Sequence, residues 1–218
     1  MAEIDPARAG AQILPFYLAG DAGDVALIRG RLASVGGPAT SILDRHGYPD
    51  AVASLQAEAL AIAACLSTFM KFDGVFTLQA KGNGYVKTLL ADMTSDGALR
   101  GYTAFDAGAP PPVGTDMAES LPASVPALLG SGYAAFTVDQ GANTDRYQGI
   151  VELSGQTLSA CTHAYFQQSE QLDAGVMIAA GRGPGPWRAG GIMVQRLPYA
   201  RDLPGRPSED EYDDLWRT

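Results

Sequence analysis

The feature that most constrains the fold is a long, alanine-rich apolar stretch, residues 51–70, which reads AVASLQAEALAIAACLSTFM. Pro49 precedes it, where the first turn of a helix tolerates proline, and Asp73-Gly74 would end the helix. Apolar residues recur at the spacing of one helix face: Leu55, Ala59, Ile62, Leu66 and Met70. A stretch of about 20 apolar residues could also span a membrane. Because Gln56 and Glu58 lie inside it and polar groups are costly in hydrocarbon, we predict a buried core helix instead.

A glycine-rich tripeptide, Gly82-Asn83-Gly84, lies between two strand-like segments. Residues 75–79 alternate as a strand does, and residues 85–93 are mostly β-branched, aromatic or aliphatic. A phosphate cradle would need a helix after the glycines, whereas the following residues, YVKTLLADM, predict a strand. We therefore predict a hairpin turn made of residues that tolerate positive φ. Ser95-Asp96-Gly97 repeats the pattern before residues 99–105, so a three-stranded meander is expected.

The rest of the chain predicts further strands, a second helix and two irregular connections. The predicted strands are residues 24–35, 133–139, 147–153, 175–180 and 192–195. Gly36-Gly37-Pro38 would end the first strand, and a helix is expected near residues 156–171. Residues 106–131 predict a connection with one short helix, and residues 181–191 (GRGPGPWRAGG) predict a long hairpin loop. The fold class is therefore α+β, with antiparallel hairpins and meanders packed with helices in a single core domain.

Charge and composition exclude several classes of partner. The formal net charge is −9, and the three lysines Lys71, Lys81 and Lys87 are too few to neutralise phosphates, so we expect no nucleic-acid binding. The N-terminal apolar run over residues 13–19 is short and contains Pro15, so we see no secretory signal. We expect a cytoplasmic protein with no membrane partner.

Candidate catalytic and metal-binding residues are few. The only histidines are His46 and His163, and the only cysteines are Cys65 and Cys161. The motifs GxSxG, HExxH and GxxxxGK[ST] are absent from the sequence. Paired zinc ligands usually lie about two to five residues apart, which these four residues do not. We therefore predict no catalytic residue, no cofactor and no zinc in this chain, and we interpret both cysteines as buried thiols.

The acidic C-terminal segment predicts the start of a helix. Ser208 followed by Glu211 is a capping-box pattern, and Tyr212, Leu215 and Trp216 follow at helical spacing. Only about ten residues follow the cap, fewer than the roughly 12 to 15 that an isolated helix needs. We expect a core domain over residues 1–196, followed over residues 197–218 by the truncated start of a helical linker.

Ordered motifs extend over nearly the whole chain: RHGYP (45–49), KFDGVFTLQAKGNG (71–84), GALRGYTAFD (97–106), YQGIVELSG (147–155), AYFQQSEQ (164–171) and GGIMVQRLP (190–198). Together they resemble the heat shock protein 33 family, the redox-regulated molecular chaperones. The resemblance implies a holdase that binds unfolding proteins and prevents their aggregation under oxidative stress. It implies unfolded client proteins as partners and a homodimer, and it implies no catalytic residue because the activity is binding.

The family also carries a C-terminal zinc module with a C-x-C and a C-x-x-C motif. The resemblance implies that its four thiolates hold zinc in the reduced, inactive protein, and that oxidation unfolds the module and exposes the client surface. Neither motif occurs in these 218 residues. We therefore expect this chain to lack the redox switch and to bind clients constitutively. The residues of the client surface cannot be predicted, because apolar strand faces look alike whether they meet a core, a partner or a client.

Two other classes of function stay open at this stage. A small-molecule or nucleotide-binding enzyme would use the two glycine-rich segments and would show a deep polar pocket beside Gly82. A structural assembly protein would show a permanent interface and would not bind unfolded chains.

Overall fold

The alanine-rich helix lies at the centre of the fold. The structure, a computed structural model, describes residues 11–19, 26–69, 72–110, 112, 124–141, 146–170, 173–182, 184–198 and 208–217. Helix α2 (Asp50–Ser67) is buried at every position from residue 51 to residue 67. Its length and composition would suit a membrane span, but 94% of it lies inside the protein. The predicted core helix is confirmed, and its many alanines let other elements approach it closely.

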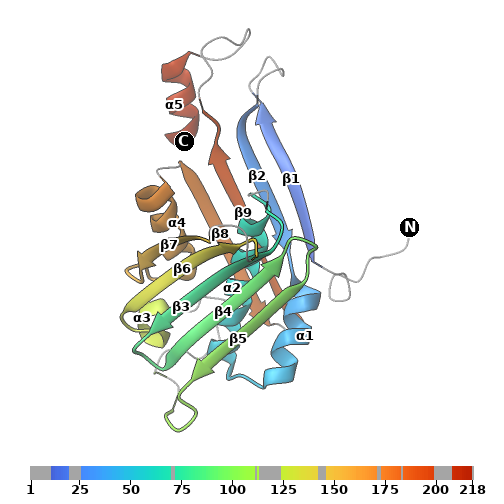
Figure 1. Cartoon of the computed structure of the whole chain (residues 1–218), viewed down its shortest axis with the longest axis vertical. Helices are drawn as coiled ribbons and strands as arrows, with labels where there is room; N and C mark the ends of the chain where they lie inside the picture. Colours follow the sequence, from blue (N-terminus) through green and yellow to red (C-terminus); the bar gives the residue numbers. More distant parts are fainter. Residues whose placement is uncertain are drawn as a thin grey trace, which may run out of the picture.

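Two antiparallel sheets cover opposite sides of α2 (Figure 1). Sheet A has the strand order β1-β2-β9-β8, and sheet B has the order β5-β4-β3-β6-β7. Helix α2 contacts β8 and β9 on one side and β4 and β5 on the other. Sheet A consists of β1 (Gln12–Ala19), β2 (Ala26–Ser34), β9 (Trp187–Arg196) and β8 (Ala174–Arg182). Sheet B consists of β5 (Leu99–Phe105), β4 (Val86–Thr94), β3 (Val75–Gly82), β6 (Gly132–Asp139) and β7 (Tyr147–Glu152). The predicted α+β class and the three-stranded meander are confirmed.

The remaining helices lie at the ends and edges of the sheets. They are α1 (Gly36–His46), α3 (Val125–Leu128), α4 (Leu158–Tyr165), the π-helix η1 (Phe166–Glu170) and α5 (Glu209–Arg217). Helix α4 contacts the edge strands β7 and β8. The predicted helix near residues 156–171 is confirmed as α4 and η1, and the Thr157 hydroxyl caps its first turn by accepting a bond from the Ala160 N–H. The short helix expected within residues 106–131 is α3, whereas much of that connection lies outside the described residues.

Two elements were not predicted, and proline explains both omissions. Gly36-Gly37-Pro38 was expected only to end a strand, but it forms the first turn of α1, where proline is tolerated. Pro15 lies inside β1, which pairs only with β2 at the edge of sheet A. An edge strand accepts proline because half of its N–H groups face away from the sheet.

The turn predicted at Gly82-Asn83-Gly84 is confirmed, but the physical reason for it was wrong. Neither glycine is among the described glycines with positive φ. A Cβ atom on Gly82 would lie 2.1 Å from the Leu129 carbonyl oxygen, so glycine is required here by close backbone contact. The N–H groups of Asn83 and Gly84 donate to the carbonyl oxygens of Ser131 and Leu129 at 3.0 and 2.8 Å.

The prediction of a long hairpin loop over residues 181–191 was also wrong. Strand β8 continues to Arg182 and β9 begins at Trp187, so most of the segment is strand. Trp187 and Ala189 are buried, and β9 pairs with β8 on one side and β2 on the other. Pairing on both sides of β9 outweighs the low strand preference of its glycines.

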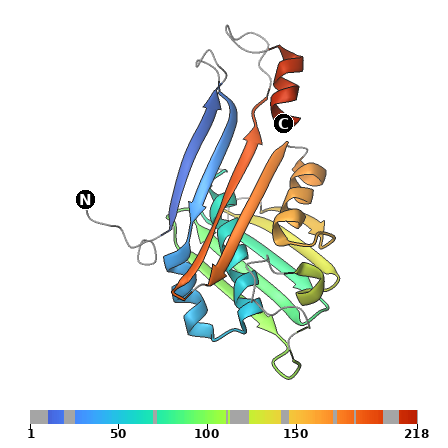
Figure 2. The same ribbon diagram turned by 180° about the vertical axis from the view of Figure 1, so that it is seen from behind.

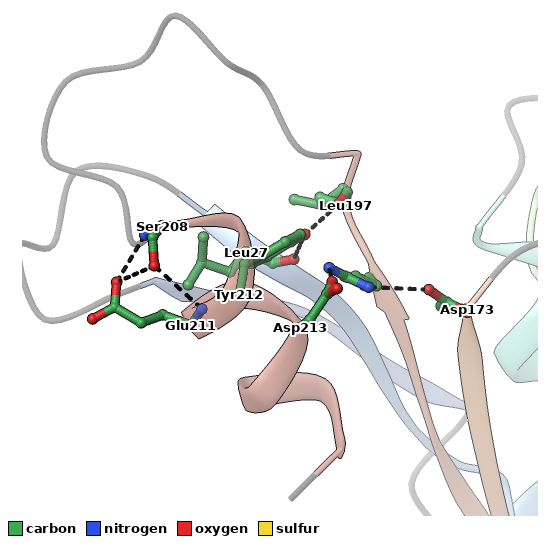
Figure 3. Close-up of polar contacts among 8 residues, drawn as sticks. Leu27, Asp173, Leu197, Ser208, Glu211, Tyr212 and Asp213 are labelled. Carbon is green, nitrogen blue, oxygen red and sulfur yellow. Dashed lines mark hydrogen bonds and ion pairs between the residues drawn. The ribbon is translucent and has the colours of Figure 1, made fainter.

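The predicted capping box begins α5 (Figure 3). The Ser208 N–H donates to the Glu211 carboxylate at 2.8 Å, and the Glu211 N–H donates to the Ser208 hydroxyl at 3.3 Å. The hydrogen bonds lower the pKa of the Glu211 carboxyl. The helix start is confirmed, and the assignment of residues 197–218 to a linker stays a prediction.

Helix α5 is attached to the end of sheet A through Tyr212 and Arg196 (Figure 3). The buried Tyr212 hydroxyl donates to the Leu27 carbonyl oxygen at 3.0 Å and also contacts the Leu197 carbonyl oxygen. The Arg196 guanidinium lies 4.2 Å from the Tyr212 ring centroid and forms ion pairs with Asp173 and Asp213. These contacts connect α5 to the ends of β2 and β9.

Candidate functional site

A row of four apolar side chains crosses the outer face of sheet A. Leu14 pairs with Leu32, Leu32 pairs with Ile192, and Ile192 pairs with Met177. Directly paired residues in antiparallel strands point to the same side of the sheet. Their exposed fractions are 60% for Leu14, 47% for Leu32, 37% for Ile192 and 72% for Met177. The neighbouring Met193 is buried on the side of α2, so the row faces away from the core.

The rows on either side of these residues are also uncharged. One is Phe16, Gly30, Val194 and Gly175, and the other is Gln12, Ser34, Gly190 and Ala179. A Cβ atom on Gly30 would lie 2.0 Å from Phe16 Cζ, which shows that the Phe16 ring lies over the Gly30 backbone. The missing side chain on Gly30 therefore lets an aromatic ring lie flat on the sheet. Leu18, half exposed, continues the apolar face along β1.

We call these three rows together with Leu18 the outer face of sheet A. Among the described elements, no helix lies in front of its strands (Figure 2). Its middle row is entirely apolar, its polar side chains Gln12 and Ser34 lie in a border row, and the charged Arg196 lies at the opposite border, in the row of Leu18. An exposed apolar surface of this kind is a typical site of protein interaction. Such a surface can exclude water from an apolar partner, and it offers no nucleophile, acid or base.

The predicted thiols lie away from this face, in the interior. Cys65 is buried in α2, and its burial raises the pKa of its thiol to about 12. Cys161 is buried in α4, where burial also raises the thiol pKa. Because the thiolate is the reactive and metal-binding form, both cysteines are poor nucleophiles and poor ligands as placed.

The two histidines lie on separate helices. His46 is at the end of α1, with its ring stacked on Tyr48 at 5.0 Å between centroids, and His163 lies in α4. Within the described ranges, no three His, Cys, Asp or Glu residues come together in a group that could hold a metal ion. The zinc content of the chain stays a prediction, to be measured by elemental analysis.

The glycine-rich turn gives little support to the enzyme interpretation. The N–H groups of Asn83 and Gly84, which a phosphate would need, already donate to backbone carbonyls of residues 129–131. The site therefore lacks the free backbone donors of a phosphate cradle.

Sequence reasoning missed the residues of the outer face, although part of the signal was present. Leu14, Phe16 and Leu18 alternate along β1, but Pro15 between them obscured the strand. The alignment of Leu32 with Ile192 depends on the pairing of β2 with β9, which no local pattern indicates.

Comparison with known proteins identifies the class to which this fold and surface belong. The chain is 38% identical over 193 residues to the 33 kDa chaperonin of Caulobacter vibrioides (strain NA1000 / CB15N), a match that covers 87% of this chain and 61% of that protein. It is 34% identical over 192 residues to the 33 kDa chaperonin of Pseudomonas putida (strain GB-1), covering 87% of this chain and 58% of that protein. The chain thus spans about three fifths of the length of these curated relatives. Both of these relatives are named chaperonins.

The fold and the family agree with this class. The crystal structure of the 33 kDa chaperonin from Thermotoga maritima matches with a TM-score of 0.65 at 24% identity, covering 77% of this chain and 57% of that one. The family model for the Hsp33 protein matches residues 22–215. The chain belongs to the Hsp33 family, and the family resemblance drawn from the six sequence motifs is confirmed.

Proposed function

We propose that this chain is a holdase that binds unfolding proteins through the outer face of sheet A and keeps them from aggregating. The observation that carries the proposal is the uncharged row of Leu14, Leu32, Ile192 and Met177, exposed on a sheet whose other face packs on α2. Holding an unfolded chain requires accessible apolar area rather than a reactive group. The outer face of sheet A supplies such area and no catalytic side chain.

We propose further that these 218 residues protect clients equally in reducing and oxidising conditions. Redox regulation in the family is implied to depend on four zinc-binding thiolates, and this sequence has neither cysteine motif. Its two thiols are buried and their pKa values are raised, so they are poorly suited to sense an oxidant. Protection under oxidative stress would then require only that the face of sheet A is accessible.

We propose that the chain forms a homodimer in the cytoplasm, in equilibrium with the form whose outer face of sheet A is free to bind clients. The apolar outer face of sheet A supports self-association, because pairing two copies would remove apolar area from water. The acidic composition, with a formal net charge of −9, supports a soluble protein of this compartment. Sedimentation at several protein concentrations would measure the dimer directly.

Light scattering from an aggregating, chemically denatured client enzyme tests the proposal. The chain should suppress scattering to the same extent with dithiothreitol and with peroxide. The variant Leu32→Lys, which places a charge in the middle of the apolar row, should suppress it much less at equal concentration. Protection only after peroxide would place a redox switch in Cys65 or Cys161, and full protection by Leu32→Lys would mean that clients bind elsewhere.

A further inference from the structure

A cavity lies on the opposite side of sheet A from the apolar row, at the end of the space between the two sheets. It has a volume of about 80 Å³. Leu66 and Phe69 at the end of α2 form one wall, and Met193 and Phe136 from the inner faces of sheets A and B form two others. Tyr147, about half exposed, lies at its margin and marks where the cavity reaches the surface. This site is separate from the outer face of sheet A.

Aromatic rings line most of the cavity. They are Phe69, Phe76, Phe136, Tyr147, Tyr165 and Phe166. Phe136 and Tyr165 stack at 4.3 Å between centroids, and Phe166 meets the Tyr165 ring edge-on at 5.2 Å. These contacts hold the rings in place, so the cavity is a preformed apolar space with a fixed shape.

One charged side chain, Arg29, and one amide, Gln195, face this apolar space. The Arg29 Nε and Nη2 groups both donate to Gln195 Oε1, at 2.8 and 2.6 Å. The Gln195 oxygen is therefore occupied by Arg29, whereas its amide nitrogen has no acceptor among the residues that the structure describes. Gln195 is only 5% exposed, but its amide nitrogen is not completely buried, so water or a ligand that enters the cavity can accept a hydrogen bond from it.

The charge of Arg29 is also uncompensated within the described part of the chain. Its guanidinium lies over the Phe69 ring at 5.1 Å, and the Arg31 guanidinium lies over the same ring at 5.0 Å. The ion pairs between described residues involve Arg100, Arg146 and Arg196, and none involves Arg29 or Arg31. Arg45, Arg182 and Arg188 also lack an ion pair among the described residues, but Arg29 is the arginine that lines the cavity.

We propose that this cavity binds a carboxylate carried on a short apolar chain. The carboxylate would accept hydrogen bonds from the free N–H groups of Arg29, of which three remain after its two bonds to Gln195, and from the Gln195 amide nitrogen. The apolar chain would lie among the aromatic rings. A cavity of about 150 Å³ holds a benzene ring, so this smaller cavity would enclose only the few carbons next to the carboxylate, and the rest of a longer chain would extend past Tyr147 to the surface.

Such a carboxylate could come from a free short-chain acid or from the C-terminal residue of a peptide that ends in leucine. Both present a carboxylate next to a small aliphatic group, so the cavity recognises the same chemistry in each. The site does not depend on the holdase proposal, because a holdase needs no charged cavity.

Isothermal titration calorimetry of the full chain with hexanoate and with hexan-1-ol tests the proposal. Hexanoate should bind at least about tenfold more tightly than the alcohol, because hydrogen bonds to charged groups contribute about 1.5–3 kcal/mol. Arg29→Met should abolish that preference. Arg100→Met, a matched change at an arginine far from the cavity lining, should retain it.

Two further comparisons distinguish a free acid from a peptide C-terminus and keep the test valid if a variant misfolds. Gly-Gly-Leu with a free C-terminus should bind if peptide ends are recognised, whereas the same peptide with an amidated C-terminus should not. The comparison of hexanoate with hexan-1-ol uses the unaltered protein, so it remains decisive even if Arg29→Met fails to fold. Equal binding of hexanoate and hexan-1-ol, or no binding of hexanoate, would overturn the proposal. Neither result would bear on the holdase proposal, which the aggregation assay tests separately.

Discussion

The outer faces of the two sheets differ in the polarity of their exposed side chains. On sheet B, a polar row crosses all five strands: Arg100, Asp92, Thr77, Thr137 and Gln148. Asp92 accepts bonds from the Thr77 hydroxyl at 2.7 Å and from Arg100 Nε at 2.8 Å. The corresponding row on sheet A, from Leu14 to Met177, contains no polar side chain.

This difference shows that exposure alone does not identify an interaction surface. Sheet B also exposes large apolar residues, among them Tyr102 and Ile150. Gln79 lies between them in the same row, and the ladder around Asp92 borders that row. A face interrupted by polar groups can stay in water, whereas the continuous apolar face of sheet A gains by being covered.

The largest effect that we expect concerns the hidden side of sheet A. Cys65 Sγ would lie 3.4 Å from a Cβ atom on Gly191, so sheet A covers this thiol directly. With its pKa raised to about 12, Cys65 should react with a thiol reagent at pH 8 more than about a thousandfold more slowly than in the unfolded chain. Labelling followed by peptide mass spectrometry measures this. Fast labelling in the native protein would show that sheet A separates from α2.

The second prediction compares the same substitution, isoleucine to lysine, on the outer faces of sheet A and sheet B. Ile192→Lys on sheet A should remove most of the protection of an aggregating client, because it puts a charge within the apolar row. Ile150→Lys on sheet B should leave protection nearly unchanged. Both residues are exposed isoleucines on outward strand faces, so the pair is matched for chemistry. An equal loss of client protection in the two variants would show that clients do not prefer the outer face of sheet A to that of sheet B.

The third prediction breaks the polar ladder of sheet B. Asp92→Leu should destabilise the protein by about 1–3 kcal/mol in urea unfolding, because the buried Asp92 and the partly buried Thr77 lose their hydrogen bond. At equal concentrations of folded protein, the variant should protect an aggregating client as well as the unaltered protein does. Thr137→Val, which removes only the bond from Gln148, is the control and should have a smaller effect.

The fourth prediction loosens the end of sheet A. Tyr212→Phe removes the hydroxyl that contacts the carbonyl oxygens of Leu27 and Leu197. We expect faster amide hydrogen exchange in α5, by about fivefold for the loss of about 1 kcal/mol of hydrogen bonding. Exchange in sheet B should not change, and a uniform increase over the whole chain would contradict a local role.

The smallest effect is the pH dependence of the helix cap. Hydrogen bonds from Ser208 lower the pKa of the Glu211 carboxyl in the folded state below its ordinary value. The cap therefore contributes fully above the unfolded pKa and is lost as the pH falls through the lower folded value. Exchange in α5 should rise over that range, and Ser208→Ala should make exchange at neutral pH resemble that of the acidified protein.

Sequence reasoning succeeded where a local pattern decides the structure. The periodic alanines and leucines of residues 50–67 and the capping box at Ser208 each contain their own signal. It failed at Pro15 and Pro38, because the tolerance for proline depends on whether a strand is at an edge and whether a helix is starting. The outer face of sheet A could not be predicted, because it requires the register of strands far apart in sequence.

The same long-range pairing has a consequence for how the protein is made. Strands β1 and β2 are synthesised early, and β8 and β9, which complete sheet A, come from residues 174–196. At translation rates of about 5–20 residues per second, β2 waits on the order of ten seconds for its partner β9. During that interval one side of α2 and one edge of β2 lack their cover. The nascent chain is therefore aggregation-prone, and sheet A, with its apolar outer face, is complete only after β9 has left the ribosome.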